Sequence, residues 1–409
     1  MYVRDVSDRY RWVVLAGGTL AQASFAAVSV GLPALAPALQ SEYDLSLGAT
    51  GVVLGAVGVG MLATLLPWGL LADRVGERAV IVLGLAGAAA ALAATAETAT
   101  FAGLVALLVV AGALGASVNG ASGRAVMGWF GLEERGLALG IRQTAIPIGG
   151  AGAAASLPWL ASAGGTQLAF LALAGGCLVG AAVGGILLRD ASPRPVSTGA
   201  PATPPLRDGH MWLLGGGSAL YLVAQIAITN FVVLFLHQHR GLSTSAAAAV
   251  LALINVLGIG ARIGAGRWSD RRRARIGPMR ELGIALAAGT VAVSVLVDAP
   301  LALLVPAVVV CGVLGLSWNG LSFTAAAETA GAARSGAALG FQQTLLGVTA
   351  AAAPPAFAAV VDASSWRIAF AAAVAGPAAG VLALRRVPEP TSGRAVRIPG
   401  TSATPRAAR

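Results

Sequence analysis

Charged residues are scarce in this chain, and lysine is missing altogether. Only 11% of the 409 residues are charged, whereas 57% are hydrophobic. Soluble domains carry about 25% charged residues. A water-soluble core could not bury this much apolar surface, so we expect lipid to surround most of the chain. All 27 basic residues are arginines, which set membrane topology as well as lysines would.

Cysteine and histidine are also few. The two cysteines, Cys177 and Cys311, lie inside apolar stretches and have no disulfide or metal-binding spacing. The sequence shows no nucleophile spaced with a base, no phosphate-binding loop and no metal cluster. We therefore expect neither an enzyme nor a bound metal or cofactor. Alanine and glycine are abundant instead, and small residues let membrane helices approach closely.

Twelve apolar stretches are long enough to cross a bilayer. A crossing takes about 20 residues, because the hydrocarbon core is about 30 Å thick. The first stretch is too long for a signal-peptide core, so we expect it to be retained. The sequence thus predicts an all-α membrane protein with twelve transmembrane helices. They cover residues 12–36, 47–71, 79–98, 101–123, 136–159, 167–188, 211–236, 245–268, 281–299, 300–323, 336–360 and 366–386.

The arginines predict how these helices are oriented, because cytoplasmic loops are rich in basic residues. If both termini are cytoplasmic, 23 of the 27 arginines lie on that side, and Arg240 and Arg367 lie outside. The outer loops then hold five acids: Glu42, Asp44, Glu97, Asp298 and Asp362. We expect a multi-pass protein of the plasma (inner) membrane. The net charge of +10 is spread between apolar stretches, so we expect no nucleic-acid partner.

The longest connection between predicted spans divides them six and six. It runs from Arg189 to His210 and contains five prolines, a composition that favours an extended, poorly ordered linker. We predict an N-terminal six-helix bundle, a cytoplasmic linker, a C-terminal six-helix bundle and a disordered cytoplasmic tail. Their residues are 1–190, 191–210, 211–388 and 389–409.

The two halves share residues at a constant offset of 200. Asn119-Gly120 recurs as Asn319-Gly320, and Gln143-Thr144 recurs as Gln343-Thr344. Chance rarely keeps one register through several spans, so this pattern indicates an internal repeat. Many transporters have their binding sites at the interface of such repeats.

A short charged turn joins the second and third spans. Its sequence is Gly69-Leu70-Leu71-Ala72-Asp73-Arg74-Val75-Gly76-Glu77-Arg78. A related turn lies 197 residues later: Gly266-Arg267-Trp268-Ser269-Asp270-Arg271-Arg272-Arg273. The first turn resembles the signature loop of the major facilitator superfamily, and the second lies where that family has its degenerate copy. One departure is Glu77, where the family often has a basic residue.

The resemblance covers residues 12–386. It implies the major facilitator fold, in which two pseudo-symmetric six-helix bundles surround a central cavity that opens to one side of the membrane at a time. It also implies a conformational latch in the two turns, with Asp73 and Asp270 each facing a helix N-terminus of the opposite bundle. The other interpretation is that these charges are solvated and only fix topology. The latch residues would be Gly69, Asp73, Arg74, Gly76, Arg78, Gly266, Asp270 and Arg271.

Two arginines lie inside predicted spans. Arg142 and Arg262 are each eight residues from a predicted helix end, at Glu134 and Asp270. That spacing is about 12 Å at about 1.5 Å per residue, close to mid-depth. A buried arginine costs at least about 2.5–3.5 kcal/mol unless it faces water, a counter-ion or a ligand. No acid lies deep in any span. One guanidinium in each half therefore predicts an anion site, whereas the alternative is snorkelling to the interface.

The segment from Ala261 to Gly266 also resembles the arginine segment of the eighth helix in the monocarboxylate and oxalate transporter branches. In those branches this arginine binds the substrate carboxylate, a role that the resemblance gives to Arg262. The monocarboxylate branch has an acid one turn earlier, where this chain has Gly258. The segment from Gly140 to Thr144 is similar, less closely, to the fifth helix of bacterial anion carriers.

Polar residues at helical spacing supply the rest of a candidate cavity. Asn255 lies seven residues before Arg262, on the same face of its helix. Each of the others is either a ligand contact or a hydrogen bond between helices, which is worth about 0.6 kcal/mol. Together the predicted substrate-binding residues are Arg142, Arg262, Asn255, Tyr221, Gln225, Gln22, Asn119, Trp318, Asn319 and Gln342.

The sequence favours a secondary active transporter that moves a small organic anion, such as a carboxylate, by alternating access. Its partners would be that substrate, the lipid bilayer and a coupling ion, and we expect a monomer. One alternative is a proton-coupled drug or metabolite exporter, which needs a titratable acid in the cavity. Another is a membrane receptor that binds without transporting.

Overall fold

The computed structural model describes residues 2–130, 134–189, 207–331 and 335–390. The N-terminal half begins with a long helix that is interrupted by a 3₁₀ turn. Its elements are α1 (Tyr2–Ser29), η1 (Leu32–Leu35), α2 (Ala36–Tyr43), α3 (Leu47–Val75), α4 (Glu77–Ala96), α5 (Phe101–Trp129), α6 (Arg135–Gln143) and α7 (Ala145–Leu187).

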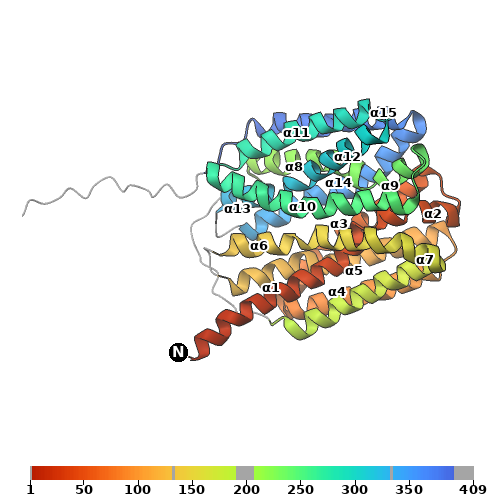
Figure 1. Ribbon diagram of the computed structural model, residues 1–409. Helices are drawn as coiled ribbons and strands as arrows, with labels where there is room; N and C mark the ends of the chain where they lie inside the picture. Colours follow the sequence, from red (N-terminus) through yellow and green to blue (C-terminus); the bar gives the residue numbers. More distant parts are fainter. Residues whose placement is uncertain (1, 131–133, 190–206, 332–334, 391–409) are drawn as a thin grey trace, which may run out of the picture.

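The C-terminal half repeats this arrangement. Its elements are α8 (Gly209–Thr229), α9 (Val232–Leu234), the π-helical turn η3 (Phe235–His239), α10 (Thr244–Arg272), α11 (Ile276–Val295), α12 (Leu301–Ser317), α13 (Asn319–Ala330), α14 (Ser335–Ala363), α15 (Trp366–Ala373) and α16 (Ala375–Leu384). Figure 1 shows the two halves as bundles of nearly parallel helices, the first coloured red to yellow and the second green to blue.

Within the described residues, eleven helical segments are long and apolar enough to cross a membrane. The longest, Gly140–Leu187, has 48 residues, and its backbone leaves helical geometry at Gly164 and Gly165. Gly165 has φ +69°, a conformation that favours glycine. At about 1.5 Å per residue this segment is more than twice the thickness of a hydrocarbon core, about 30 Å, so it makes two crossings. The predicted twelve-helix membrane fold is confirmed.

Several boundaries differ from those predicted by apolar run length. The first span continues to Tyr43, the tenth continues to Ala330, and the ninth covers Ile276–Val295. Helix starts are set by polar caps that run length ignores. Ser46 Oγ accepts a hydrogen bond from Ala49 N, and Ser243 Oγ accepts one from Ala246 N. The predicted linker and tail, apart from their ends, lie outside the described residues, so the domain boundaries stay predictions.

Glycines bring neighbouring helices into backbone contact. A Cβ built on Gly60 of α3 would lie 1.9 Å from the carbonyl oxygen of Val109 in α5. One built on Gly112 of α5 would lie 2.2 Å from the carbonyl oxygen of Val57 in α3. Only glycine leaves room for this crossing, which matches the role of small residues in membrane helix packing.

The two bundles meet along α3 with α14 and along α7 with α10. A Cβ on Gly55 would lie 2.7 Å from the carbonyl oxygen of Ala351, so α3 and α14 also approach closely. Gly48 N donates a hydrogen bond to Asp362 Oδ2 over 2.7 Å, and Gln238 donates one to Gln40. These contacts join the bundles at one end of the helices.

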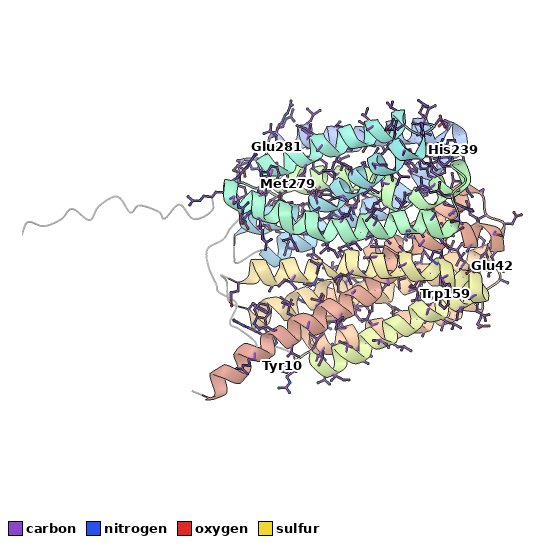
Figure 2. All side chains as sticks on the ribbon, in the orientation of Figure 1. Tyr10, Glu42, Trp159, His239, Met279 and Glu281 are labelled. Carbon is purple, nitrogen blue, oxygen red and sulfur yellow. The ribbon has the colours of Figure 1, made fainter. Side chains whose placement is uncertain are left out.

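The two ends of the molecule carry different charges. At one end, which we call the arginine face, lie the start of α1, the ends of α5 and α7, and the turn from Arg271 to Arg275. The other end, the acidic face, carries Glu42, Glu97, Asp298 and Asp362, beside Arg240 and Arg367. Figure 2 shows Tyr10 and Glu281 toward the first end, and Glu42 and His239 at the second. This segregation is the one that the arginine count predicted.

Replacing Gly112 by alanine tests the crossing of α3 and α5. The new Cβ forces a backbone shift, and overpacking of this kind costs about 1–3 kcal/mol. We expect Gly112→Ala to unfold in detergent at a lower temperature than the wild type. The control is Gly120→Ala in the same helix, because nothing lies within 4 Å of a Cβ built there. Equal unfolding temperatures for the two variants would contradict the close packing.

Candidate functional site

Arg142, in the last turn of α6, lies at the centre of a buried polar cluster in the N-terminal bundle. The side chain is only 7% exposed. Its Nε donates to Ser122 Oγ over 2.9 Å, and its Nη2 donates to Gln22 Oε1 over 2.9 Å and to the carbonyl oxygen of Asn119 over 2.5 Å. Gln22 Nε2 in turn donates to Asn119 Oδ1 over 2.5 Å. The guanidinium therefore ties α1, α5 and α6 together.

The matching position of the C-terminal half carries a neutral residue. Gln342 lies 200 residues after Arg142 and is fully buried. Its Nε2 donates to Ser322 Oγ, and the Ser322 hydroxyl shares a hydrogen bond of 2.5 Å with Ser218. Ser322 is the repeat partner of Ser122, so both halves build the same hydroxyl contact. Of the two residues that bind these serines, Arg142 is charged and Gln342 is neutral.

Arg262 provides the second buried guanidinium, from α10 of the other bundle. The side chain is 9% exposed. Its Nε donates to the carbonyl oxygen of Leu316 in α12 over 2.9 Å. Its Nη1 crosses to the N-terminal bundle and donates to the carbonyl oxygen of Gln143 over 3.0 Å. The side chain of Gln143 also contacts Arg142, whose Nη1 donates to Gln143 Oε1 over 3.5 Å. One residue therefore touches both arginines.

The partners of both arginines are neutral. Across the part of the chain that the structure describes, neither Arg142 nor Arg262 forms an ion pair with a carboxylate. Hydroxyl, amide and carbonyl oxygens stabilise a buried guanidinium but leave its charge in place. The arrangement can therefore bind an anion, which would gain hydrogen bonds and a compensating charge together.

Asn255 faces the same segment of the opposite bundle as Arg262. It is fully buried, and its Nδ2 donates to the carbonyl oxygen of Leu251 over 2.9 Å. A Cβ built on Gly150 of α7 would lie 2.8 Å from Asn255 Oδ1. That oxygen has no hydrogen-bond partner among the described atoms, and the same holds for Gln342 Oε1.

Other predicted site residues pair within the C-terminal bundle. Asn319 Nδ2 donates to Gln225 Oε1 over 3.2 Å, which joins α13 to α8. The Tyr221 hydroxyl donates to the carbonyl oxygen of Met279 in α11 over 3.2 Å. The Tyr221 ring packs edge-on against Trp318, with ring centroids 5.8 Å apart. In this structure Tyr221 therefore contacts α11, and not the arginines of the site.

The predicted latch is described only in part. The side chain of Asp73 lies outside the described residues. The carbonyl oxygen of Gly69 accepts a hydrogen bond from Arg124. Gly76 has φ +86°, a conformation that favours glycine and forms the tight turn between α3 and α4. Asp270 accepts a hydrogen bond of 2.5 Å from Arg275, a partner that the sequence did not predict. Arg74, Arg78 and Arg271 are exposed, and Gly266 faces open space.

Arg275 and Glu389 are the residues of this region that sequence reasoning missed. Arg275 also donates to Glu328 over 3.0 Å, so it joins the ends of α10 and α13. Glu389 accepts hydrogen bonds from the backbone N–H groups of Arg275, Ile276 and Gly277, which caps the start of α11. A Pro-Glu-Pro tripeptide after the last span was the only sequence signal for this cap.

Two apolar hollows on the molecule offer no charge to an anion. One, of about 290 Å³, lies between α10, α11 and α12 and includes Trp268, Leu282 and Val313. The other, of about 300 Å³, includes Ser24, Gly152 and Leu173. Neither is lined by an arginine, so the candidate site stays with Arg142 and Arg262.

Substituting Arg142 by leucine and by glutamine tests how the polar cluster is held. Both variants remove the buried charge, so their difference isolates the hydrogen bonds. Glutamine can still donate to Ser122, as Gln342 does to Ser322. Leucine leaves several acceptors without a donor, each at about 1–3 kcal/mol. We expect Arg142→Leu to unfold at a lower temperature than Arg142→Gln. Equal temperatures would show that the cluster does not need the donor.

Comparison with known proteins shows the family of the chain. A family model described as Major Facilitator Superfamily matches residues 14–354. The chain is 32% identical over 376 residues to an uncharacterized MFS-type transporter of Mycobacterium tuberculosis (strain ATCC 25618 / H37Rv), which covers 91% of this chain and 84% of that protein. The corresponding protein of strain CDC 1551 / Oshkosh matches to the same extent.

Solved structures share the fold at low sequence identity. A D-xylose-proton symporter has a TM-score of 0.75 and 15% identity, over 93% of this chain and 99% of that one. The human organic anion transporter MFSD10 (TETRAN) has a TM-score of 0.72 and 16% sequence identity, over 92% of this chain and 99% of that one. A bacterial homolog of the human lysosomal transporter Spinster, in an inward-facing and occupied conformation, has a TM-score of 0.71 and 17% sequence identity, over 92% of this chain and 95% of that one. This chain therefore belongs to the major facilitator superfamily, as a multi-pass membrane protein of a transporter family.

Proposed function

We propose that this secondary transporter moves a small organic anion, with a carboxylate as the group that it recognises. The observation that carries the proposal is the pair of buried guanidiniums, Arg142 and Arg262, which come from opposite bundles and both contact Gln143. Their neutral partners leave two positive charges in a low-dielectric region, where an anion is strongly favoured. The organic anion transporter among the structural neighbours shares only the fold, so it does not carry this proposal.

Arg262 has donors to spare and is the better anchor of the two. A guanidinium has five N–H groups. The hydrogen bonds that the described residues make with Arg262 use Nε and Nη1, which leaves both hydrogens of Nη2 for a ligand. Arg142 already uses Nε, Nη1 and Nη2. We therefore assign the carboxylate to Arg262, with Arg142 adding positive potential from the opposite bundle.

Alternating access is part of the proposal. We take the arginine face to be cytoplasmic, following the positive-inside rule. Gly48 with Asp362 and Gln40 with Gln238 then join the bundles at the outer end. Opening to the outside requires these bonds to break, while Asp73 and Asp270 would hold the cytoplasmic end. Asn255 and Gln342 each have a side-chain oxygen without a hydrogen-bond partner among the described residues, and a substrate hydroxyl or amine would donate to it.

A thermal-shift screen of purified protein tests the substrate class. Small carboxylic acids and lipophilic cations are added to the wild type, to Arg262→Gln and to the control Arg367→Gln, which changes an arginine of the acidic face. A ligand at about 100 times its Kd stabilises a protein by about 2.7 kcal/mol. We expect acids to raise the unfolding temperature of the wild type and the control, but not of Arg262→Gln.

Two outcomes would contradict the proposal. Stabilisation of Arg262→Gln by the same acids would remove this residue from the site. Stabilisation by cations alone would favour a drug exporter instead. Uptake of the stabilising acid into proteoliposomes separates a transporter from a receptor that binds without transporting.

A further inference from the structure

The carbonyl oxygen of Gln143 lacks its usual hydrogen-bond partner within the helix, because the residue four positions later is a proline. In an α-helix this oxygen would accept a hydrogen bond from the N–H of residue 147, four positions later. Residue 147 is a proline, which has no N–H. The helix is interrupted at this point, where Thr144 N bonds to the carbonyl oxygen of Ile141 over 3.0 Å. The Gln143 oxygen therefore needs a donor from outside its own helix.

Arg262 supplies that donor from the other bundle. Among the described residues three hydrogen bonds join the two bundles, and two of them lie at the acidic face. The third is the contact of 3.0 Å between Arg262 Nη1 and the Gln143 oxygen, which is the one that uses a buried charge. The second acceptor of Arg262, Leu316, lies in the last turn of α12, where carbonyl groups also lack helical partners. Both carbonyl groups that bind Arg262 therefore lie at helix interruptions, one in each bundle.

We propose that the Gln143 carbonyl is an internal ligand that an incoming carboxylate displaces from Arg262. The inference rests on the proposed function. A carbonyl oxygen is neutral and binds one N–H, whereas a carboxylate brings a negative charge and accepts two parallel hydrogen bonds. When Nη2 donates one of these bonds, Nη1 donates the second, and Nη1 is the nitrogen that now bonds the Gln143 carbonyl. The carboxylate therefore competes with this carbonyl for the same nitrogen. When it does, the hydrogen bond that joins the bundles at this depth is lost. Substrate binding then loosens the contact between the bundles.

Pro147 makes the displacement of the Gln143 carbonyl from Arg262 unfavourable. Once Arg262 leaves, the Gln143 oxygen has no helical N–H to return to, and an unpaired buried acceptor is unfavourable. That cost lowers the affinity for the anion and links binding to the opening of the bundles. Pro147 and Gln143 therefore act as positioning residues, through Arg262, and not as direct substrate contacts.

Restoring the missing N–H tests the inference. In Pro147→Ala and in Pro147→Gly the helix can bond the Gln143 oxygen itself, so the carboxylate no longer has to displace it. We expect the Kd for a stabilising acid to fall about tenfold, a change of about 1.4 kcal/mol. Turnover in proteoliposomes should fall at the same time, because binding no longer breaks a contact between the bundles. A variant that is merely misfolded would not bind more tightly.

The matched control is Pro158→Ala, which changes the other proline of α7, in the interior of that helix. The described hydrogen bonds of Arg262 go to Gln143 and Leu316, and not to the carbonyl that Pro158 leaves open. Its Kd should stay at the wild-type value. The glycine variant separates the two effects of proline, since it restores the N–H but keeps the backbone pliable.

The outcomes also separate this inference from the proposed function. An unchanged Kd in both Pro147 variants, with binding abolished in Arg262→Gln, overturns the inference and leaves the anion site standing. Equal tightening in Pro158→Ala overturns it too, because straightening of the helix would then explain the effect. If Arg262→Gln binds acids as the wild type does, the proposed function itself fails.

Discussion

The structure depends on the cost of holding positive charge away from water. Two guanidiniums lie almost fully buried, one from each bundle, and each would cost at least about 2.5–3.5 kcal/mol if it were left in hydrocarbon. Neutral oxygens reduce that cost. Arg142 donates to side chains of α1 and α5 and to one backbone carbonyl of α5, whereas the partners of Arg262 among the described residues are backbone carbonyls alone. Because no carboxylate of the described residues pairs with either guanidinium, the two charges support the proposed anion site.

Irregular helix geometry supplies the acceptors. The interruption after Gln143 and the one at Trp318 both fall where spans would otherwise be continuous. A carbonyl at such a break can turn to a side chain of another helix. The repeat is not symmetric at this point: Ser122 and Ser322 hold equivalent positions, but one pairs with an arginine and the other with a glutamine.

The sequence predicted the fold, because the thickness of the lipid core imposes the length of the apolar stretches. It also placed Arg142 and Arg262 inside spans, where the structure finds both side chains buried. It could not predict their partners. Gln143 and Leu316 bind Arg262 through backbone oxygens, which no side-chain pattern encodes. Tyr221 lies on the predicted stripe yet turns to α11, since which neighbour a helix face meets depends on packing. Asp270 pairs with Arg275 across a turn, a contact set by the left-handed conformation of Arg273.

A structure of the protein with a bound small carboxylic acid tests the central claim most directly. The account predicts the carboxylate within hydrogen-bond distance of Arg262 Nη2, between the two bundles. An acid bound elsewhere, with the Arg262 guanidinium still on its carbonyl partners, would contradict it, and so would a protein carboxylate found in that place.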